Sequence, residues 1–224
     1  MSATPHSTAR ASRGFTLIEV MVAMMIMAML AVMAWQGVDG IVKARSFSQA
    51  RLEQTLRLNT VIAQWEQDLA AIQETTAVPG LTFDGSTARM TRRAERGMQV
   101  VTWSLKPAAE GTSGGGTWLR WASPAVLTNG ELQDLWMRTQ QFQGLETGQL
   151  KTLKGITQWQ MYCYWGSWSN CQSTGNQQAG QPAGSASAPA PIQRQALPSG
   201  VRLVLEFSGG DMNGRLMRDV ALGP

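Results

Sequence analysis

The residue with the clearest chemical demand is Glu19, a carboxylate near the start of a long apolar segment. It is the fifth residue of a run from Phe15 to Trp35 that holds no other charged side chain. A helix of about 20 apolar residues can cross a membrane. An acid inside such a helix costs roughly 2.5 to 3.5 kcal/mol at the bilayer centre and less near an interface. The sequence therefore predicts that Glu19 acquires a partner.

The residues around Glu19 read Arg13-Gly14-Phe15-Thr16-Leu17-Ile18-Glu19-Val20. This string resembles the processing site of the type IV pilin superfamily, which includes the pseudopilins of type II secretion. The resemblance implies that a prepilin peptidase cuts between Gly14 and Phe15 at the cytoplasmic face and that Phe15 is then N-methylated. It also implies that Glu19 meets the N-terminal amine of a neighbouring subunit. Phe15 and Glu19 are one helical turn apart at about 1.5 Å per residue, so an axial shift between subunits can join the two groups.

Two simpler interpretations of the same segment stay open. A secretory signal would also carry basic residues such as Arg10 and Arg13, with Val32-Met33-Ala34 as its cleavage site and Trp35 near the new N-terminus. The apolar run is longer than the usual signal core, however, and its helical pattern continues past Ala34. In a plain membrane anchor, Glu19 would only extend its carboxylate to the lipid headgroups.

Composition excludes several classes of function. The chain has 19 basic and 15 acidic side chains. Because Arg10 and Arg13 fall in the predicted leader, the processed chain is nearly neutral and lacks a nucleic-acid footprint. The single histidine, His6, also lies in that leader. The processed chain then has no imidazole for a Ser-His-Asp site or a His-ligated metal, so we expect no enzyme activity, no cofactor and no metal.

Cys163 and Cys171 are the only two cysteines. Their spacing is not C-x-x-C, and no further cysteine or suitable histidine is present to complete a zinc site. In an oxidising compartment such a pair favours a disulfide. Closing so short a loop stabilises a fold by about 2 to 3 kcal/mol in the chain-entropy description.

A helix is predicted to continue beyond the apolar run to about Gln73. Its apolar positions step by three and four residues, which is typical of an amphipathic helix packed on a sheet. These positions are Leu58, Ile62, Trp65, Leu69 and Ile72, and the polar residues assigned to the other faces are Arg51, Glu53, Arg57, Gln64, Gln67 and Asp68.

Short strands are predicted from Leu81 onward, because apolar residues alternate between Gly-rich turn signals. The interval from Glu131 to Phe142 stays open between a strand and a short helix. The predicted hairpins are Leu81–Phe83 with 88–92 across Asp84-Gly85, Gln99–Leu105 with Thr117–Trp121, and Val201–Phe207 with Arg215–Leu222; Ile156–Trp165 is a further strand.

The order of these segments resembles the J-type minor pseudopilins (the GspJ/PulJ family). The shared strings are Trp103-Ser104-Leu105, Leu119-Arg120, the strand from Trp159 to Trp165 with a variable loop after it, and Leu197-Pro198 leading into Val201. This resemblance implies a place near the pseudopilus tip, with the I-type and K-type minor pseudopilins, the major pseudopilin and the prepilin peptidase as partners. A PilW-like minor pilin of a type IV pilus shares the motif and stays an alternative.

Nine tryptophans raise the question of a ligand site lined by indole rings. Trp65, Trp103 and Trp159 lie at periodic positions and are predicted to be buried. Trp165 and Trp168 are the candidates for an exposed pair, which would more often mark a protein interface than a carbohydrate site. A secreted or anchored binding module lined by tryptophan is therefore the second class of function considered.

The resulting prediction is an α+β, pilin-like fold with a long N-terminal helix on an antiparallel β-sheet. The expected localisation is the bacterial inner membrane, with a single crossing and the C-terminal domain in the periplasm. The expected function is a structural and assembly subunit. The expected segments are a leader (1–14), a transmembrane helix (15–36), the periplasmic half of the helix (37–75), and a β-rich domain (76–224) with a flexible loop at 172–196.

Overall fold

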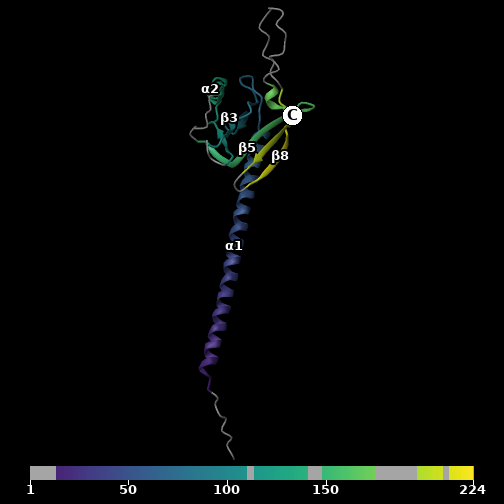
Figure 1. The fold of residues 1–224 in the computed structure, drawn as a ribbon. Helices are drawn as coiled ribbons and strands as arrows, with labels where there is room; N and C mark the ends of the chain where they lie inside the picture. Colours follow the sequence, from purple (N-terminus) through teal and green to yellow (C-terminus); the bar gives the residue numbers. More distant parts are fainter. Residues whose placement is uncertain (1–13, 110–113, 141–147, 175–195, 209–211, 224) are drawn as a thin grey trace, which may run out of the picture. The chain divides into compact units, whose positions relative to one another are not determined.

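The computed structural model describes residues 14–109, 114–140, 148–174, 196–208 and 212–223. The chain divides into two units, Met1–Leu52 and Glu53–Pro224, and each is described by itself. The helix α1 (Leu17–Ala70) begins in the first unit and ends in the second. Figure 1 shows α1 as one continuous helix.

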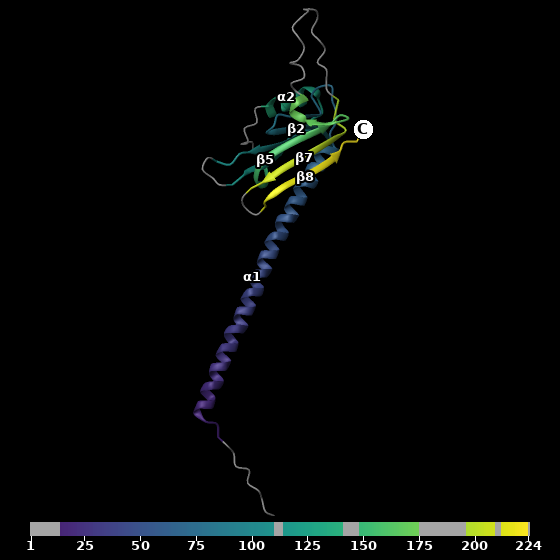
Figure 2. The ribbon, with the colours of Figure 1, turned by 45° about the vertical axis from the view of Figure 1, so that its right-hand side comes forward.

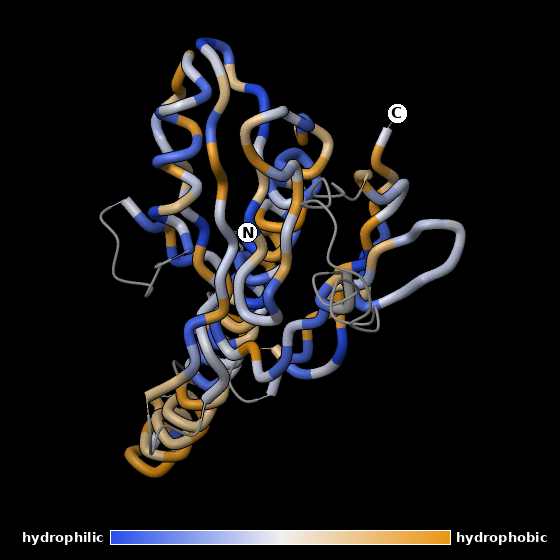
Figure 3. The backbone as a smooth tube through the Cα atoms, turned by 90° about the horizontal axis from the view of Figure 1, so that it is seen from above, coloured by the Kyte–Doolittle hydropathy of each residue, from blue (hydrophilic) through white to orange (hydrophobic). Residues whose placement is uncertain are grey.

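The second unit is an antiparallel sheet with helices on its faces, which confirms the predicted α+β fold. Its strands follow the order β1-β2-β3-β4-β5-β7-β8, and β6 pairs with the end of β5. Figure 3 shows apolar and polar stretches interleaved along this unit, as expected of strands with two different faces. The strands are β1 (Leu81–Phe83), β2 (Thr87–Ala94), β3 (Gly97–Lys106), β4 (Gly116–Ala122), β5 (Leu150–Tyr164), β6 (Trp168–Asn170), β7 (Gly200–Phe207) and β8 (Gly214–Ala221).

All three predicted hairpins are present. β1 pairs with β2, β3 with β4, and β7 with β8, each in antiparallel register. The strand predicted at Ile156–Trp165 is the second part of β5, which begins earlier, at Leu150. β5 has room for this length because its first part pairs with β4 and its second part with β6 and β7.

The interval left open in the sequence is a helix, α2 (Asn129–Gln140). A capping box begins it: the Thr128 hydroxyl donates to Glu131 (2.7 Å), and the Glu131 amide donates back to the Thr128 hydroxyl (3.3 Å). Leu132 and Trp136 are buried on the side of α2 that packs against Val100 of β3. The T-x-x-E pattern at Thr128 was the sequence signal for this helix.

We call the sheet face packed on α1 the inner face and the opposite one the outer face. On the inner face, Trp65 of α1 stands among three tryptophans of the sheet. Its ring centroid lies 5.5 Å from Trp103, 5.3 Å from Trp118 and 6.2 Å from Trp159. The predicted burial of Trp65, Trp103 and Trp159 is confirmed, since they are 0%, 0% and 5% exposed. The tryptophans of this group fill the core.

α1 ends at Ala70, three residues before the predicted end at Gln73. The backbone beyond it turns to β2 instead of continuing the helix. The Gln73 amide donates to the Thr91 carbonyl (2.9 Å), and the Arg93 amide donates to the Ala71 carbonyl (3.1 Å). Because strand pairing satisfies these groups, the helical periodicity that reaches Ile72 overestimates the helix.

Candidate processing and assembly site

The predicted cleavage bond lies just ahead of α1. Gly14, Phe15 and Thr16 have no regular secondary structure, and the first helical hydrogen bond runs from the Val20 amide to the Thr16 carbonyl (3.3 Å). A methyl group placed at Gly14 would meet no atom of the described residues within 4 Å, its chain neighbours aside. The bond between Gly14 and Phe15 is therefore accessible and free of helical constraint, as a protease requires of its substrate.

Glu19 lies on the first turn of α1, where its negative charge interacts favourably with the positive end of the helix dipole. Phe15 and Glu19 line one side of a shallow apolar hollow on the helix surface, together with Ala23 and Met27 at further steps of four residues. Within the part of the chain that the structure describes, no hydrogen bond or ion pair reaches the Glu19 carboxylate. A partner for the Glu19 carboxylate would therefore have to come from outside these residues.

The surroundings of this end of α1 are those of a membrane anchor. Every residue from Gly14 to Glu53 is exposed, including large apolar side chains such as Phe15 (83%), Met27 (70%) and Trp35 (76%). By length and composition this helix is able to cross a membrane. An apolar surface of this extent is stable in lipid and costly in water.

The other end of α1 carries a site that the sequence analysis missed. Asp68 was assigned to a polar face, but its side chain is completely buried. It accepts hydrogen bonds from both Arg120 Nε (2.7 Å) and Arg120 Nη2 (2.9 Å), and it also pairs with Arg92. The indole Nε1 of Trp103 donates to the same carboxylate (2.9 Å), and Gln64 donates at 3.2 Å. Asp68 thus joins α1 to β2, β3 and β4 at one point.

The signal for this site was present in the strands. Arg92 shares its strand face with Met90, and Arg120 shares its face with Trp118, so both arginines point toward the core. Two inward-facing arginines require an acid, because a buried unpaired charge is very costly. Asp68 lies three residues after Trp65, on the helix side that faces the sheet, and is the acid that fits.

Two further polar contacts fasten α1 to other strands. Arg57 donates through Nε to the Thr152 carbonyl of β5 (2.8 Å) and through Nη2 to the Lys151 carbonyl (3.2 Å). Glu66 accepts a hydrogen bond from Arg218 of β8, and this contact raises the pKa of the arginine. Together with the contacts of Asp68 to β2, β3 and β4, these bonds attach the helix to strands from near one edge of the sheet to the other.

The predicted disulfide between Cys163 and Cys171 is present, with 5.1 Å between the two Cα atoms. It ties the end of β5 to the short helix η1 (Cys171–Thr174). Most of the predicted loop at 172–196 lies outside the described residues. Of its ends, Gln172 belongs to η1, and the Ala196 carbonyl accepts a hydrogen bond from Trp165 Nε1 (3.0 Å).

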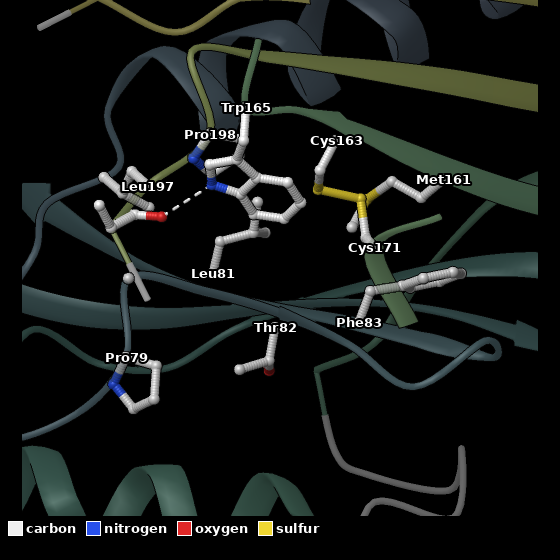
Figure 4. A pocket seen from close by; sticks show the side chains of 12 residues that line it. Pro79, Leu81, Thr82, Phe83, Met161, Cys163, Trp165, Cys171, Leu197 and Pro198 are labelled. Carbon is white, nitrogen blue, oxygen red and sulfur yellow. Dashed lines mark hydrogen bonds between the residues drawn. A yellow bond between two sulfur atoms is a disulfide. The ribbon is translucent and has the colours of Figure 1, made fainter. Parts of the chain in front are cut away.

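A small pocket lies beside the disulfide, between Leu81, Trp165 and Pro198 (Figure 4). Its volume is about 50 Å³, room for a few water molecules and far below the roughly 300 Å³ of typical ligand sites. Trp165 packs against the core at its wall. The pocket therefore offers no cavity for a sugar or a peptide.

The predicted exposed pair is divided by the structure. Trp165 is half-buried and hydrogen-bonded, whereas Trp168 is 39% exposed on the outer face. The Trp168 ring packs on Tyr164 (5.2 Å between centroids), and the Arg202 guanidinium lies over it at 4.3 Å. Arg202 in turn makes two hydrogen bonds to Asp219, both of 2.7 Å. Trp168, Arg202 and Asp219 therefore form a row of contacting side chains that crosses the outer face to β8.

Residues 9–35 match the prokaryotic N-terminal methylation motif. No curated protein matches the chain. The matched segment contains the predicted cleavage bond, Phe15, Glu19 and the apolar part of α1. With a long N-terminal helix and an antiparallel sheet, the motif indicates a protein of the type IV pilin and pseudopilin kind, with a single-pass membrane anchor.

Proposed function

We propose that the protein is a minor pseudopilin of the J-type, a structural and assembly subunit at the tip of a type II secretion pseudopilus that supports export of folded proteins. The observation that carries this proposal is the methylation motif, in which an accessible bond after Gly14 precedes a helix whose Glu19 has no partner among the described residues. In this proposal the protein is anchored in the bacterial inner membrane, its sheet unit is periplasmic, and it acts by assembly and not as an enzyme.

Assembly explains the unpartnered acid. If the peptidase removes residues 1–14, the new amine of Phe15 in one subunit is a cation that fits Glu19 of the next. An ion pair in an apolar environment is favourable only when both charges are present and in contact. The carboxylate would then select neighbours that have been processed, because an unprocessed chain has no amine at that position.

Replacement of Gly14 by leucine tests the processing step. A Cβ at position 14 meets no described residue beyond its chain neighbours, so loss of cleavage would reflect a poorer fit to the peptidase and not a disturbed fold. We expect intact-mass analysis of Gly14→Leu to show the retained leader, and the wild-type chain to begin at a methylated Phe15. Normal maturation of Gly14→Leu, or an N-terminus near Trp35, would refute the proposal.

The choice of J-type rests on the sequence strings around Trp103, Leu119, Trp159 and Pro198. Co-purification of the full-length protein with I-type and K-type minor pseudopilins, together with loss of protein export in a deletion strain, would support it. Co-purification with pilus subunits and loss of pili would instead favour the PilW-like alternative. Either result keeps the protein among the assembly subunits.

The proposed periplasmic location has its own test. Cys163 and Cys171 are buried and joined in the structure, so alkylation of freshly lysed cells without reductant should leave both unmodified. Prior reduction under denaturing conditions should make both reactive. Two free thiols in the untreated cells would contradict the oxidising location.

A further inference from the structure

The two edges of the sheet differ in their capacity to accept another strand. At one edge, β1 has only three residues, and it lies beside Leu197 and Pro198 in the small pocket. At the other edge, β8 has eight residues and, among the described strands, pairs with β7 alone. Figure 2 shows β5, β7 and β8 side by side, with β8 outermost.

β8 lacks several of the features by which proteins usually protect an edge. Its register with β7 is continuous from Gly214 to Ala221, without a bulge, and it contains no proline and no lysine. Natural edge strands are commonly shortened, bulged or interrupted by such residues, or carry charged side chains, to prevent pairing with other chains. β8 does carry three charged residues, Arg215, Arg218 and Asp219. Its backbone is otherwise uninterrupted along the edge, so its capacity to accept a strand depends on how these charges are satisfied.

The hydrogen bonds of β7 identify which β8 amides point outward. The Ser208 amide donates to Gly155 at the start of the β5–β7 ladder (3.1 Å), so alternate residues back from Ser208 face β5. The residues between them, such as Leu203 and Leu205, face β8 and pair with Arg218 and Leu216. The outward N–H and C=O groups of β8 thus belong to Arg215, Met217 and Asp219, and they have no backbone partner within the described residues.

The charges on β8 are already paired within the protein. Arg218 bonds Glu66 of α1, Asp219 bonds Arg202 of β7, and Arg215 lies 4.0 Å from Glu206. The hydrogen bonds to Arg202 lower the pKa of Asp219, which keeps that carboxylate charged and paired. A chain approaching this edge therefore meets three β8 charges that each have a partner among the described residues.

The remaining β8 side chains are apolar. Leu216 and Val220 are half-buried at the margin of the inner core, and Met217 is 49% exposed on the outer face. An added strand would place alternate side chains beside Leu216 and Val220 on one face and beside Met217 on the other. Apolar or uncharged side chains fit both positions.

We infer that β8 is an acceptor edge for an extended, uncharged strand of a neighbouring subunit in the assembly. This inference rests on the proposed function for the source of the strand. The occupant is recognised through its backbone by Arg215, Met217 and Asp219, and through its alternate apolar side chains by Leu216, Met217 and Val220. The sheet of one subunit then continues into the next.

Replacement of Met217 tests this inference. Met217→Pro removes an outward N–H without removing a bond to β7, and proline is tolerated on edge strands for this reason. Met217→Thr is the matched control, because it changes the same side chain and keeps the N–H. The proline variant loses one backbone hydrogen bond to the added strand, and its ring prevents the two strands from coming close together. Its incorporation into the isolated fibre, measured on the full-length protein, should therefore fall about tenfold. The threonine variant should stay within about twofold of the wild type.

Equal incorporation of the two variants would overturn the inference while leaving the proposed function intact. Failure of the wild-type chain to enter any fibre would refute the proposed function, and the acceptor edge with it. If Met217→Pro does not fold, hydrogen exchange of the wild-type chain decides. The amides of Arg215, Met217 and Asp219 should exchange rapidly in the free chain in detergent and slowly in the fibre. Unchanged exchange, or protection produced by pairing of two identical chains, would overturn the inference.

Discussion

Glu19 and Asp68 are two carboxylates on one helix, and their surroundings are opposite. Glu19 lies in an exposed apolar segment, and no described residue bonds its side chain. Asp68 is completely buried and receives hydrogen bonds from Arg92, Arg120 and Trp103. At one end of α1 the carboxylate has its hydrogen-bond partners within the described residues, and at the other end it has none there.

The comparison separates two ways in which a carboxylate on an apolar helix can be supplied with a partner. A buried ion pair contributes little net stability but becomes very costly when one partner is lost. At Asp68 both partners are in one chain, so the cost is enforced during folding and fixes how α1 lies on the sheet. In the proposed function the partner of Glu19 arrives from another chain, so the same cost would be enforced during assembly.

Asp68 should therefore show the largest effect on folding. Asp68→Ala leaves Arg92 and Arg120 without their acid, and removal of one buried partner costs about 3 to 5 kcal/mol. Denaturant unfolding of the full-length chain in detergent, followed by tryptophan fluorescence, measures this loss. Asp219→Ala is the control, since Asp219 pairs with Arg202 on the surface and exposed pairs contribute at most about 1 kcal/mol. Equal losses for both variants would contradict the role assigned to Asp68.

Trp103 sharpens the comparison within the tryptophan core. Trp103→Phe removes the indole N–H that bonds Asp68, a loss of about 1.5 to 3 kcal/mol for a hydrogen bond to a charged group. Trp118→Phe is the matched control, because its indole N–H is buried in the same cluster and has no acceptor among the described residues. The same unfolding assay should show the greater loss for Trp103→Phe. A greater loss for Trp118→Phe would show that ring packing outweighs the bond.

The motif at one end of α1 could be recognised from the sequence, whereas the buried cluster around Asp68 at the other end could not, for a physical reason. The demands of Glu19 are local: an acid, an apolar run and a preceding Gly-Phe bond lie within a few residues of one another. The demands of Asp68 are tertiary, because Arg92 and Arg120 are 24 and 52 residues away in the chain. Hairpins with local turns were likewise predicted, whereas the order of β4, β5 and β7 depends on packing that no short pattern contains.

The carboxylate of Asp84 should produce a smaller effect that depends on pH. Partial burial favours a higher pKa for Asp84, but hydrogen bonds from Ser86, Arg89 and Thr87 outweigh it and hold the pKa below its ordinary value. A lowered pKa in the folded state adds stability above the unfolded value of about 3.9, and this stability is lost as the pH falls through the folded pKa. Asp84→Asn should therefore melt below the wild type at pH 7, and the difference should close below about pH 4. A difference that stays constant with pH would assign the effect to the turn geometry.

Replacement of Glu19 should have no measurable effect on folding, in contrast to replacement of Asp68. Glu19→Val removes a polar group from an apolar segment, so the protein should stay in the membrane at least as firmly as the wild type. Unfolding of the sheet unit should change by less than about 0.5 kcal/mol, as for other exposed positions. Co-purification of the full-length chain with its fibre should nevertheless fall, because the amine of the next subunit loses its acid. Glu19→Gln separates charge from shape, since it keeps the side-chain length and removes the ion pair. Undiminished incorporation of both variants would show that the Glu19 carboxylate only reaches the lipid headgroups, and that α1 begins as a simple anchor.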